Sequence, residues 1–381
     1  MSLASQRMNL VTRFESILKV LALLQPESVA ELLAGNQAEL ISLSNRQSVK
    51  TMTVVGDSMS NDTIASPGWT SDLSVVVVTY NSRGEVAKCL ESFSRIVLEF
   101  RLKVEVRIMD NNSTDGTREW LQQNAQMFPS LNLRLNLNKK NIGLSNAVNE
   151  ELARCNSDMV LICNPDVVFT SGFIHLLNFS RQHPEFGVVP ELRNLDGTVQ
   201  RVTYRRFPTV TRILMDFTGL GIHFSRYIFS WVHDDYCYVD YKFNEPVDFL
   251  EQPGASFLLL HKDTAKKLSP FFDPQFPVLW NDVDMALRAR LLGIRFVIMP
   301  GVKIYHELGH SMKSVNHSRG ALLFFSQHGL IGFARKWNLH PRILQASIFL
   351  DAVFSFPLYV RVRGVREATE LCVAVSRSIF L

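Results

Sequence analysis

Asp166 is the residue of this chain whose position best suits chemistry. It follows an apolar run at residues 160–163 that shows no alternation, which is typical of a buried strand. Pro165 cannot donate to a strand ladder, so the strand ends there and leaves the carboxylate at its carboxyl end. In an open parallel sheet, ligands bind at that edge, where a carboxylate can hold a hard divalent cation together with a diphosphate. A polar turn that only closes the strand is the alternative.

Polar residues follow two earlier apolar runs in the same way. Thr79, Tyr80 and Asn81 come directly after residues 73–78, and their backbone groups and ring suit a nucleobase. Asp110 follows residues 104–109 and can accept hydrogen bonds from a pyrimidine or a ribose hydroxyl. The alternatives are a strand-ending turn at the first position and an Asx-turn before a helix at the second.

A helix is predicted to begin at residues 143–146, from Gly143 to Asn146. Free backbone amides at a helix start favour phosphate, so this segment is a candidate for the diphosphate. Ordinary helix capping is the alternative.

The elements that position these residues follow from the hydrophobic periodicity. Strands at 73–78, 104–109, 131–137 and 160–163 alternate with helices, including 117–128 and 144–155, which predicts an α/β fold with a parallel sheet and right-handed crossovers. Further strands are predicted at 187–190, 257–260, 296–299 and 302–305. Residues 281–284 begin a helix that Gly293 closes.

Composition bounds the class of protein. The chain has 381 residues, of which 46% are hydrophobic, and a net charge of +4, so a large core is expected and no nucleic-acid partner is required. Five scattered cysteines lack metal-ligand spacing, which favours reduced thiols and a cytoplasmic location. No signal peptide is convincing. The most apolar long stretch, 343–360, carries Asp351 and Pro357, so no membrane-spanning helix is expected.

Three regions are predicted. Residues 1–70 form an N-terminal helical extension with a polar linker, residues 71–312 a catalytic domain, and residues 313–381 a C-terminal helical region. In the last region aromatic residues lie among Arg and Lys, which predicts peripheral contact with the inner face of the cell membrane. The alternatives are helices that pack on the catalytic domain or on a second copy of the chain in a homodimer.

Six motifs occur in one order: 76–82, 110–116, 141–147, 164–167, 282–284 and the final His306. Through them, residues 73–336 resemble the family 2 inverting glycosyltransferases of GT-A type, a Rossmann-like α/β fold. The pattern is most similar to the rhamnosyltransferases that use dTDP-rhamnose to build bacterial cell-surface polysaccharide.

The resemblance implies a role for each site residue. Asp166 and His306 would bind Mg²⁺ or Mn²⁺, although the first position of the family's Asp-X-Asp motif is Asn164 here. The residues implied to contact the nucleotide-sugar are Thr79, Tyr80, Asn81, Asp110, Asn112, Gly143, Asn146, Asn164 and Arg205. For Arg205 and its neighbour Arg206, a solvated charge pair is the alternative to a phosphate contact.

Asp282 is the implied general base, which takes the proton of the acceptor hydroxyl as that oxygen attacks the anomeric carbon. The family's preceding Glu is Asn281 here, which leaves any acceptor contact at that position open. Helix capping is the alternative for Asp282, Asp284 is assigned to structure, and Trp280 either stacks on an acceptor sugar or packs in the core.

The resemblance therefore implies a hexosyltransferase that moves a sugar, L-rhamnose from dTDP-L-rhamnose, to a lipid-linked or polysaccharide acceptor. One alternative is a UDP-sugar donor on the same fold. An alternative of another class is a non-catalytic nucleotide-sugar-binding subunit of a polysaccharide assembly complex.

Overall fold

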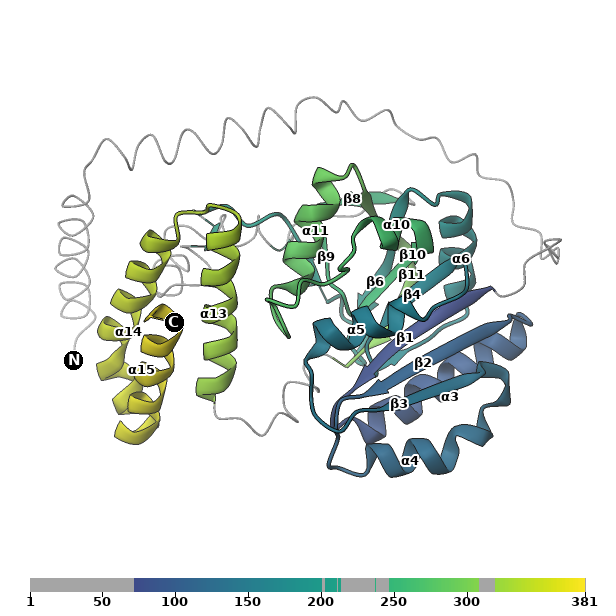
Figure 1. Ribbon diagram of the computed structural model, residues 1–381, viewed down its shortest axis with the longest axis horizontal. Coiled ribbons are helices and arrows are strands. Elements are labelled where there is room, and N and C mark those ends of the chain that lie inside the picture. The colour runs from purple at the N-terminus through teal and green to yellow at the C-terminus, as the bar shows by residue number, and fades with distance from the viewer. Residues whose placement is uncertain are drawn as a thin grey trace. The chain divides into compact units, whose positions relative to one another are not determined.

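A mixed β-sheet carries the predicted site residues (Figure 1). The structure is a computed structural model, and it describes residues 72–200, 203–210, 212–213, 237, 247–307 and 319–380. The N-terminal extension predicted at 1–70 lies outside the described residues. The predicted boundaries between the three regions stay predictions.

The sheet has nine strands within the described residues, in the order β3-β2-β1-β4-β10-β6-β11-β5, with β8 also paired to β11. These strands are β1 (Leu73–Thr79), β2 (Val104–Asp110), β3 (Leu133–Leu137), β4 (Met159–Cys163), β5 (Val167–Val168), β6 (Phe186–Arg193), β8 (Asp248–Leu250), β10 (Phe257–His261) and β11 (Arg295–His306). The strands β7 (Tyr204–Arg205) and β9 (Gln252–Pro253) form a separate antiparallel pair.

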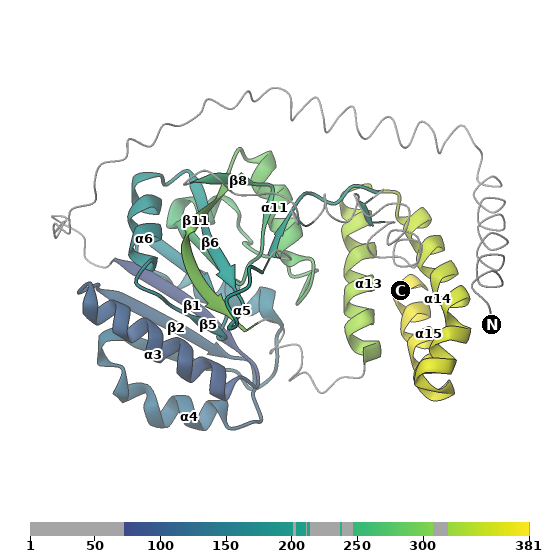
Figure 2. The same ribbon diagram turned by 180° about the vertical axis from the view of Figure 1, so that it is seen from behind.

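The helices that connect the strands end close to the predicted positions. They are α3 (Arg83–Glu99), α4 (Thr117–Asn124), α5 (Leu144–Ala153), α6 (Phe173–Gln182), α10 (Lys262–Lys267) and α11 (Asn281–Leu291), with short 3₁₀ turns at Ala125–Met127 and Pro129–Leu131. The helices α3, α4 and α6 lie in front of the sheet in Figure 2, and α5 lies in front of it in Figure 1.

The parallel sheet predicted from the strands at 73–163 is confirmed for β3, β2, β1 and β4, and the second half of the sheet is mixed. The strands β3, β2, β1 and β4 are parallel, but β10 runs antiparallel to β4 on one side and to β6 on the other. The alternation of strand and helix that predicts parallel pairing stops after β6, and the strand that directly precedes β10 is β9. The beginning of β10 therefore lies at the same edge as the ends of its neighbours.

The two strands predicted at 296–299 and 302–305 are a single strand, β11. Its register against β6 shifts between Met299 and Lys303, around Pro300 and Gly301. Proline cannot donate to the ladder, and a bulge lets the strand continue past it without ending. The consequence is that His306, at the end of β11, faces the turn after β4 through the pairing of His306 with Val167.

Aromatic side chains pack around Phe169, which follows the turn after β4. Phe169 is buried between Phe93 of α3 and Phe257 of β10, at ring-centroid distances of 4.5 and 5.7 Å. Its backbone N–H donates to Ser92 Oγ at 3.0 Å. Aromatic packing of this kind stabilises beyond the buried area alone, so the loop that carries Asp166 is anchored at its far end.

Three further helices follow the sheet: α13 (Arg319–Lys336), α14 (Pro341–Arg363) and α15 (Val365–Phe380). The buried part of α13 packs on α11, and α15 contacts both α13 and α14. The side chains of 322–325, which the sequence placed on a membrane-facing surface, lie outside the described residues. Among the described helices, none combines the length and apolarity that a transmembrane span requires.

Candidate active site

Most predicted site residues gather at one edge of the sheet. The strands β1, β2, β4, β6 and β11 run in one direction, so their carboxyl ends share an edge, which the beginning of β10 also reaches. At that edge Asn164 N–H donates to Ser256 O at 2.9 Å, and Glu307 N–H donates to Asp166 O at 3.0 Å. The turn after β4 is therefore fixed on both sides by neighbouring chain.

Asp166 and His306 meet at this edge, as predicted. His306 Nε2 lies 3.2 Å from Asp166 Oδ1, and both side chains are only 3% exposed. Asn164 Nδ2 lies 3.4 Å from the same ring nitrogen. Despite these neighbours, Asp166 Oδ1 has no hydrogen-bond partner within the described structure.

Gln200 explains why the two atoms do not bond each other. Its Nε2 donates to Asn194 Oδ1 at 2.8 Å and to the His306 carbonyl at 2.5 Å, so its Oε1 must be an acceptor. That oxygen lies 2.8 Å from His306 Nδ1, which therefore carries the ring proton. In a neutral imidazole the other nitrogen, Nε2, then carries no proton. It lies 3.2 Å from Asp166 Oδ1 and can accept from Asn164 Nδ2 at 3.4 Å.

Two buried acceptors that face each other fit a bound cation. Neutral imidazole and carboxylate both ligate divalent metals, and a hydrogen bond that fixes the histidine tautomer from behind is typical of metal sites. The described residues contain no group of three His, Cys, Asp or Glu side chains that could hold a metal. Asp166 and His306 would therefore supply two ligands, and a bound diphosphate and water could complete the set.

Gln200 was not predicted from the sequence. It lies 106 positions from His306 in the chain, and nothing in its local pattern distinguishes it from any polar loop residue. The pairing of β11 with β6, and the turn by which the chain returns beside β6 to Gln200, bring the two together.

Asp110 is completely buried, and its carboxylate already has four neighbours. Oδ2 accepts from Thr79 Oγ1 at 3.0 Å and from Ser113 Oγ at 2.5 Å. Oδ1 accepts from Ser113 N–H at 3.0 Å, and Arg118 Nη1 lies 3.5 Å away. The Thr79 side chain is buried as well. Asp110 and Thr79 therefore form a buried layer at the carboxyl ends of β1 and β2. The predicted contact between Asp110 and a nucleotide would require the hydroxyl of Thr79 or Ser113 to turn away.

Other predicted nucleotide residues lie in the loops after β1 and β2. Asn81 and Asn112 are part-exposed and adopt positive φ, 50° and 68°, a conformation that asparagine tolerates. Asn81 Oδ1 accepts from Thr114 N–H at 2.7 Å, which ties the end of β1 to the loop after β2. Tyr80, next to Asn81, is also part-exposed. Their roles toward a ligand stay predictions.

The predicted phosphate segment at the start of α5 is partly occupied by the protein itself. Gly143 has φ +82°, and a Cβ there would lie 3.0 Å from Pro277 Cβ, so only glycine fits. Ser145 N–H donates to Pro277 O at 3.2 Å, and Asn146 Nδ2 donates to Ile142 O at 2.9 Å. The turn is therefore pressed against the loop that precedes α11.

Asp282 lies in the first turn of α11, and its side chain is 17% exposed. Its Oδ2 accepts from Arg205 Nη2 at 2.7 Å. With its amide oxygen turned toward Arg205, buried Gln252 accepts from Nε and Nη2 of that arginine at 3.1 and 3.0 Å. Arg205, predicted to contact phosphate, thus lies against the predicted base, and its contact with a donor stays a prediction.

A short stretch of chain connects the two halves of the site. Gln200 holds His306, and Thr203 N–H donates to the Gln200 carbonyl at 3.1 Å. Thr203 O accepts from Gly254 N–H at 2.7 Å, in the small-residue loop before β10. Arg205, two residues later, holds Asp282. The candidate metal ligands and the candidate base therefore lie at one edge of the sheet.

Asn281, where the family pattern has Glu, makes a structural contact. It is buried, and its Nδ2 donates to Ser145 Oγ at 3.2 Å, while Ser145 Oγ donates to Phe276 O. The preceding Trp280 is also buried, which agrees with packing and not with stacking on an acceptor sugar.

Comparison with known proteins finds a matching family model and a similar curated relative. The model of the family described as "Glycosyl transferase family 2" matches residues 74–236. An N-acetylglucosaminyl-diphospho-decaprenol L-rhamnosyltransferase of Mycobacterium tuberculosis is 29% identical over 259 residues, which cover 64% of this chain and 78% of the relative.

Two solved structures are similar at 15% identity. One is the mannosyltransferase PcManGT of Pyrobaculum calidifontis in complex with GDP-Man and Mn²⁺, at a TM-score of 0.47 over 93% of this chain and 91% of that one. The other is S. aureus TarS 1-349 in complex with UDP-GlcNAc, at a TM-score of 0.46 over 81% of each chain.

Proposed function

The chain belongs to glycosyl transferase family 2, and from this premise we propose that it transfers L-rhamnose from dTDP-L-rhamnose to a lipid-linked sugar. The sugar and the kind of acceptor follow the name of the Mycobacterium tuberculosis relative, and the nucleotide follows the resemblance to rhamnosyltransferases. The observation that carries the proposed chemistry is the pair of facing acceptor atoms, Asp166 Oδ1 and His306 Nε2, 3.2 Å apart at the sheet edge.

Asp282 performs the central step of this reaction. Its carboxylate accepts the proton of the acceptor hydroxyl while that oxygen bonds to the anomeric carbon, and the bond from that carbon to the donor diphosphate breaks. One displacement inverts the anomeric centre and releases the nucleoside diphosphate. Arg205 contacts one carboxylate oxygen at 2.7 Å and so fixes the orientation of the base.

Asp166 and His306 would hold Mg²⁺ or Mn²⁺. Such a cation supplies positive charge that neutralises the departing diphosphate. Gln200 holds the ring proton of His306 on Nδ1, so that Nε2, the nitrogen near Asp166, is available as a ligand. Because Asp166 and His306 are both buried, little water can reach them to replace either ligand.

Donor binding tests this proposal. In calorimetry with Mg²⁺, dTDP-L-rhamnose is expected to bind and UDP-GlcNAc to bind weakly or not at all, and a thermal shift should follow because a ligand of the folded state stabilises it by about 2.7 kcal/mol at a hundredfold excess over Kd. Binding of UDP-GlcNAc without binding of dTDP-L-rhamnose would select the UDP-sugar alternative. Donor binding without turnover on any lipid-linked acceptor would select the non-catalytic subunit.

Gln200→Leu is expected to lower the affinity for Mn²⁺ about 10–100-fold, the usual range for loss of a residue that orients a metal ligand. The substitution frees the His306 ring to rotate and to change tautomer. Titration followed by electron paramagnetic resonance in the presence of dTDP measures the affinity directly. Gln182→Leu, an exposed position on α6, is the matched control and should bind as the wild type does. Equal affinity in both variants would remove Gln200 from the site.

We also propose peripheral contact with the inner face of the cell membrane through α14 and α15. Phe349 and Val353 lie one helical turn apart and are 45% and 50% exposed, and Arg361 and Arg366 are exposed further along. Exposed apolar residues beside cations suit the surface of an anionic bilayer. Co-sedimentation with phosphatidylglycerol vesicles tests this contact. A stable dimer in light scattering without vesicle binding would favour the homodimer instead.

A further inference from the structure

The helix α13 contacts the first turn of α11, the turn that carries the proposed base. The contacts come from two ends of that turn, at Trp280 and at Asp284, and they involve different chemistry. Arg205, on β7, holds Asp282 from another element. Two independent attachments at such close spacing leave the turn little freedom to move.

Trp280 forms the first attachment. Its Nε1–H donates to the carbonyl of Ser326 in α13 at 2.9 Å, and its ring lies 5.2 Å from that of Phe333. Gly329 of α13 lies directly under this ring, because a Cβ at that position would be 2.6 Å from Trp280 Cδ1. The backbone of Trp280 has φ +70°, a left-handed conformation that a bulky residue rarely adopts and that surrounding contacts must hold.

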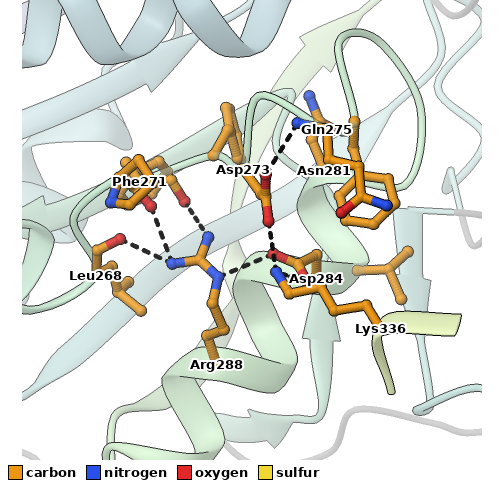
Figure 3. A network of polar contacts seen from close by, with 12 residues as sticks. Leu268, Phe271, Asp273, Gln275, Asn281, Asp284, Arg288 and Lys336 are labelled. Carbon is orange, nitrogen blue, oxygen red and sulfur yellow. Dashed lines mark hydrogen bonds and ion pairs between the residues drawn. The ribbon is translucent and has the colours of Figure 1, made fainter. Parts of the chain in front are cut away.

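Asp284 forms the second attachment (Figure 3). Its carboxylate is fully buried, and Oδ1 accepts from Lys336 Nζ at 2.6 Å and from Trp337 Nε1 at 3.0 Å. Arg288, one turn along α11, donates to Oδ2 at 2.8 Å. Lys336 also reaches Asp273 Oδ2 at 2.6 Å, in the loop before α11. Burial opposes ionisation of Asp273, but the hydrogen bond and charge of Lys336 leave the pKa of this carboxyl below its usual value.

Helix geometry separates these attachments from the reacting side chain. Each residue of an α-helix turns by about 100°, so positions 280 and 284 share one face and position 282 points about 200° away from 284. The face that α13 holds is therefore opposite the face that presents Asp282. Movement of α13 would displace Asp282 without touching any atom of its carboxylate.

We infer that α13 is a positioning element for the general base, and that Trp280, Asp284 and Gly329 are its positioning residues. The inference deepens the proposed function, because it rests on the assignment of Asp282 as the base. The C-terminal helices are then part of the machinery that orients catalysis and are more than a surface for association. Displacement of the ring by a side chain at position 329 loosens the first turn of α11 and misorients Asp282.

Gly329→Ala tests the inference, with Gly332→Ala as the matched control on the same helix. A Cβ at 332 would meet the end of the flexible Gln275 side chain at 3.1 Å, whereas a Cβ at 329 meets a buried ring. Both changes favour helix formation equally. Hydrogen exchange read by mass spectrometry should be about tenfold faster at the amides of residues 281–284 in Gly329→Ala alone, with no change in peptides that cover β4.

Turnover provides the second measurement. In Gly329→Ala we expect kcat with dTDP-L-rhamnose to fall about 10–100-fold, the range that a misplacement of up to about 1 Å produces, with KM for the donor unchanged. Trp337→Phe keeps the aromatic ring and removes the donor to Asp284, so a smaller fall in kcat is expected. Trp120→Phe, on α4, is its control.

The two measurements separate failure of the inference from failure of the proposed function. Hydrogen exchange needs no donor, so faster exchange at 281–284 supports the α13 attachment even if dTDP-L-rhamnose proves to be the wrong substrate. Exchange in Gly329→Ala equal to that in Gly332→Ala overturns the inference whatever the donor is. A fall in donor affinity equal to the fall in kcat overturns it as well, because a displaced base leaves donor binding intact.

Discussion

Asp282→Asn is expected to lower kcat about 10²–10⁴-fold, equivalent to about 3–5 kcal/mol of transition-state stabilisation, while donor affinity stays unchanged. The amide has the same shape as the carboxylate, and its oxygen can still accept from Arg205, so the local structure should be retained. What it loses is the capacity to take a proton from the acceptor hydroxyl.

The measurement is the initial rate with saturating dTDP-L-rhamnose, together with calorimetry of donor binding. Asp263→Asn is the matched control, because Asp263 is 70% exposed on α10, away from the sheet edge. Retention of more than about a tenth of wild-type kcat would show that another group accepts the proton. An equal loss of donor affinity would show that Asp282 contributes to binding instead.

Asp166→Asn is expected to have two opposite effects. It should lower the affinity for Mn²⁺ by at least about 100-fold, since loss of a ligand exceeds the usual effect of losing a residue behind one. It should also stabilise the metal-free protein, because the amide can donate to His306 Nε2 where the carboxylate places one acceptor against another. Relief of one unsatisfied buried group is worth about 1–3 kcal/mol.

Thermal unfolding with a chelator present measures the second effect, and a rise of a few degrees in Tm is expected for a domain of this size. The measurement is made at pH 8.5 for every variant. Asp196→Asn, in an exposed turn, serves as the control. A metal-free protein that loses stability would show that Asp166 and His306 form an ion pair whose role is structural.

The sequence predicted the first half of the sheet well because that half follows local rules. Apolar runs end at residues that stop a strand, as at Pro165, and parallel strands then bring their ends to one edge. The antiparallel course of β10 was not predictable, because it depends on how the chain returns after residue 247 and not on the pattern of β10 itself. Pro300 and Gly301 led to the prediction of two strands, but a register shift lets β11 continue past both residues as one strand.

At the site, residue types were predictable and partners were not. Asp166 and His306 have side chains that commonly bind metals, and each follows a strand, which is a local signal. Gln200 and the contact between Arg205 and Asp282 depend on pairings of residues 77 or more positions apart, for which a single sequence holds no local sign. The structural contact of Asn281 with Ser145, 136 positions away in the chain, has no local sign either.

The two holders of the site, Gln200 and Arg205, are five positions apart in the chain. One is fixed at His306, and the other at Asp282 and, through β7, at β9. An insertion or deletion between them would pull one holder from its partner, because both ends are anchored to separate strands and helices. The length of this short stretch is therefore set by geometry, unlike the length of a surface turn that holds no site residue.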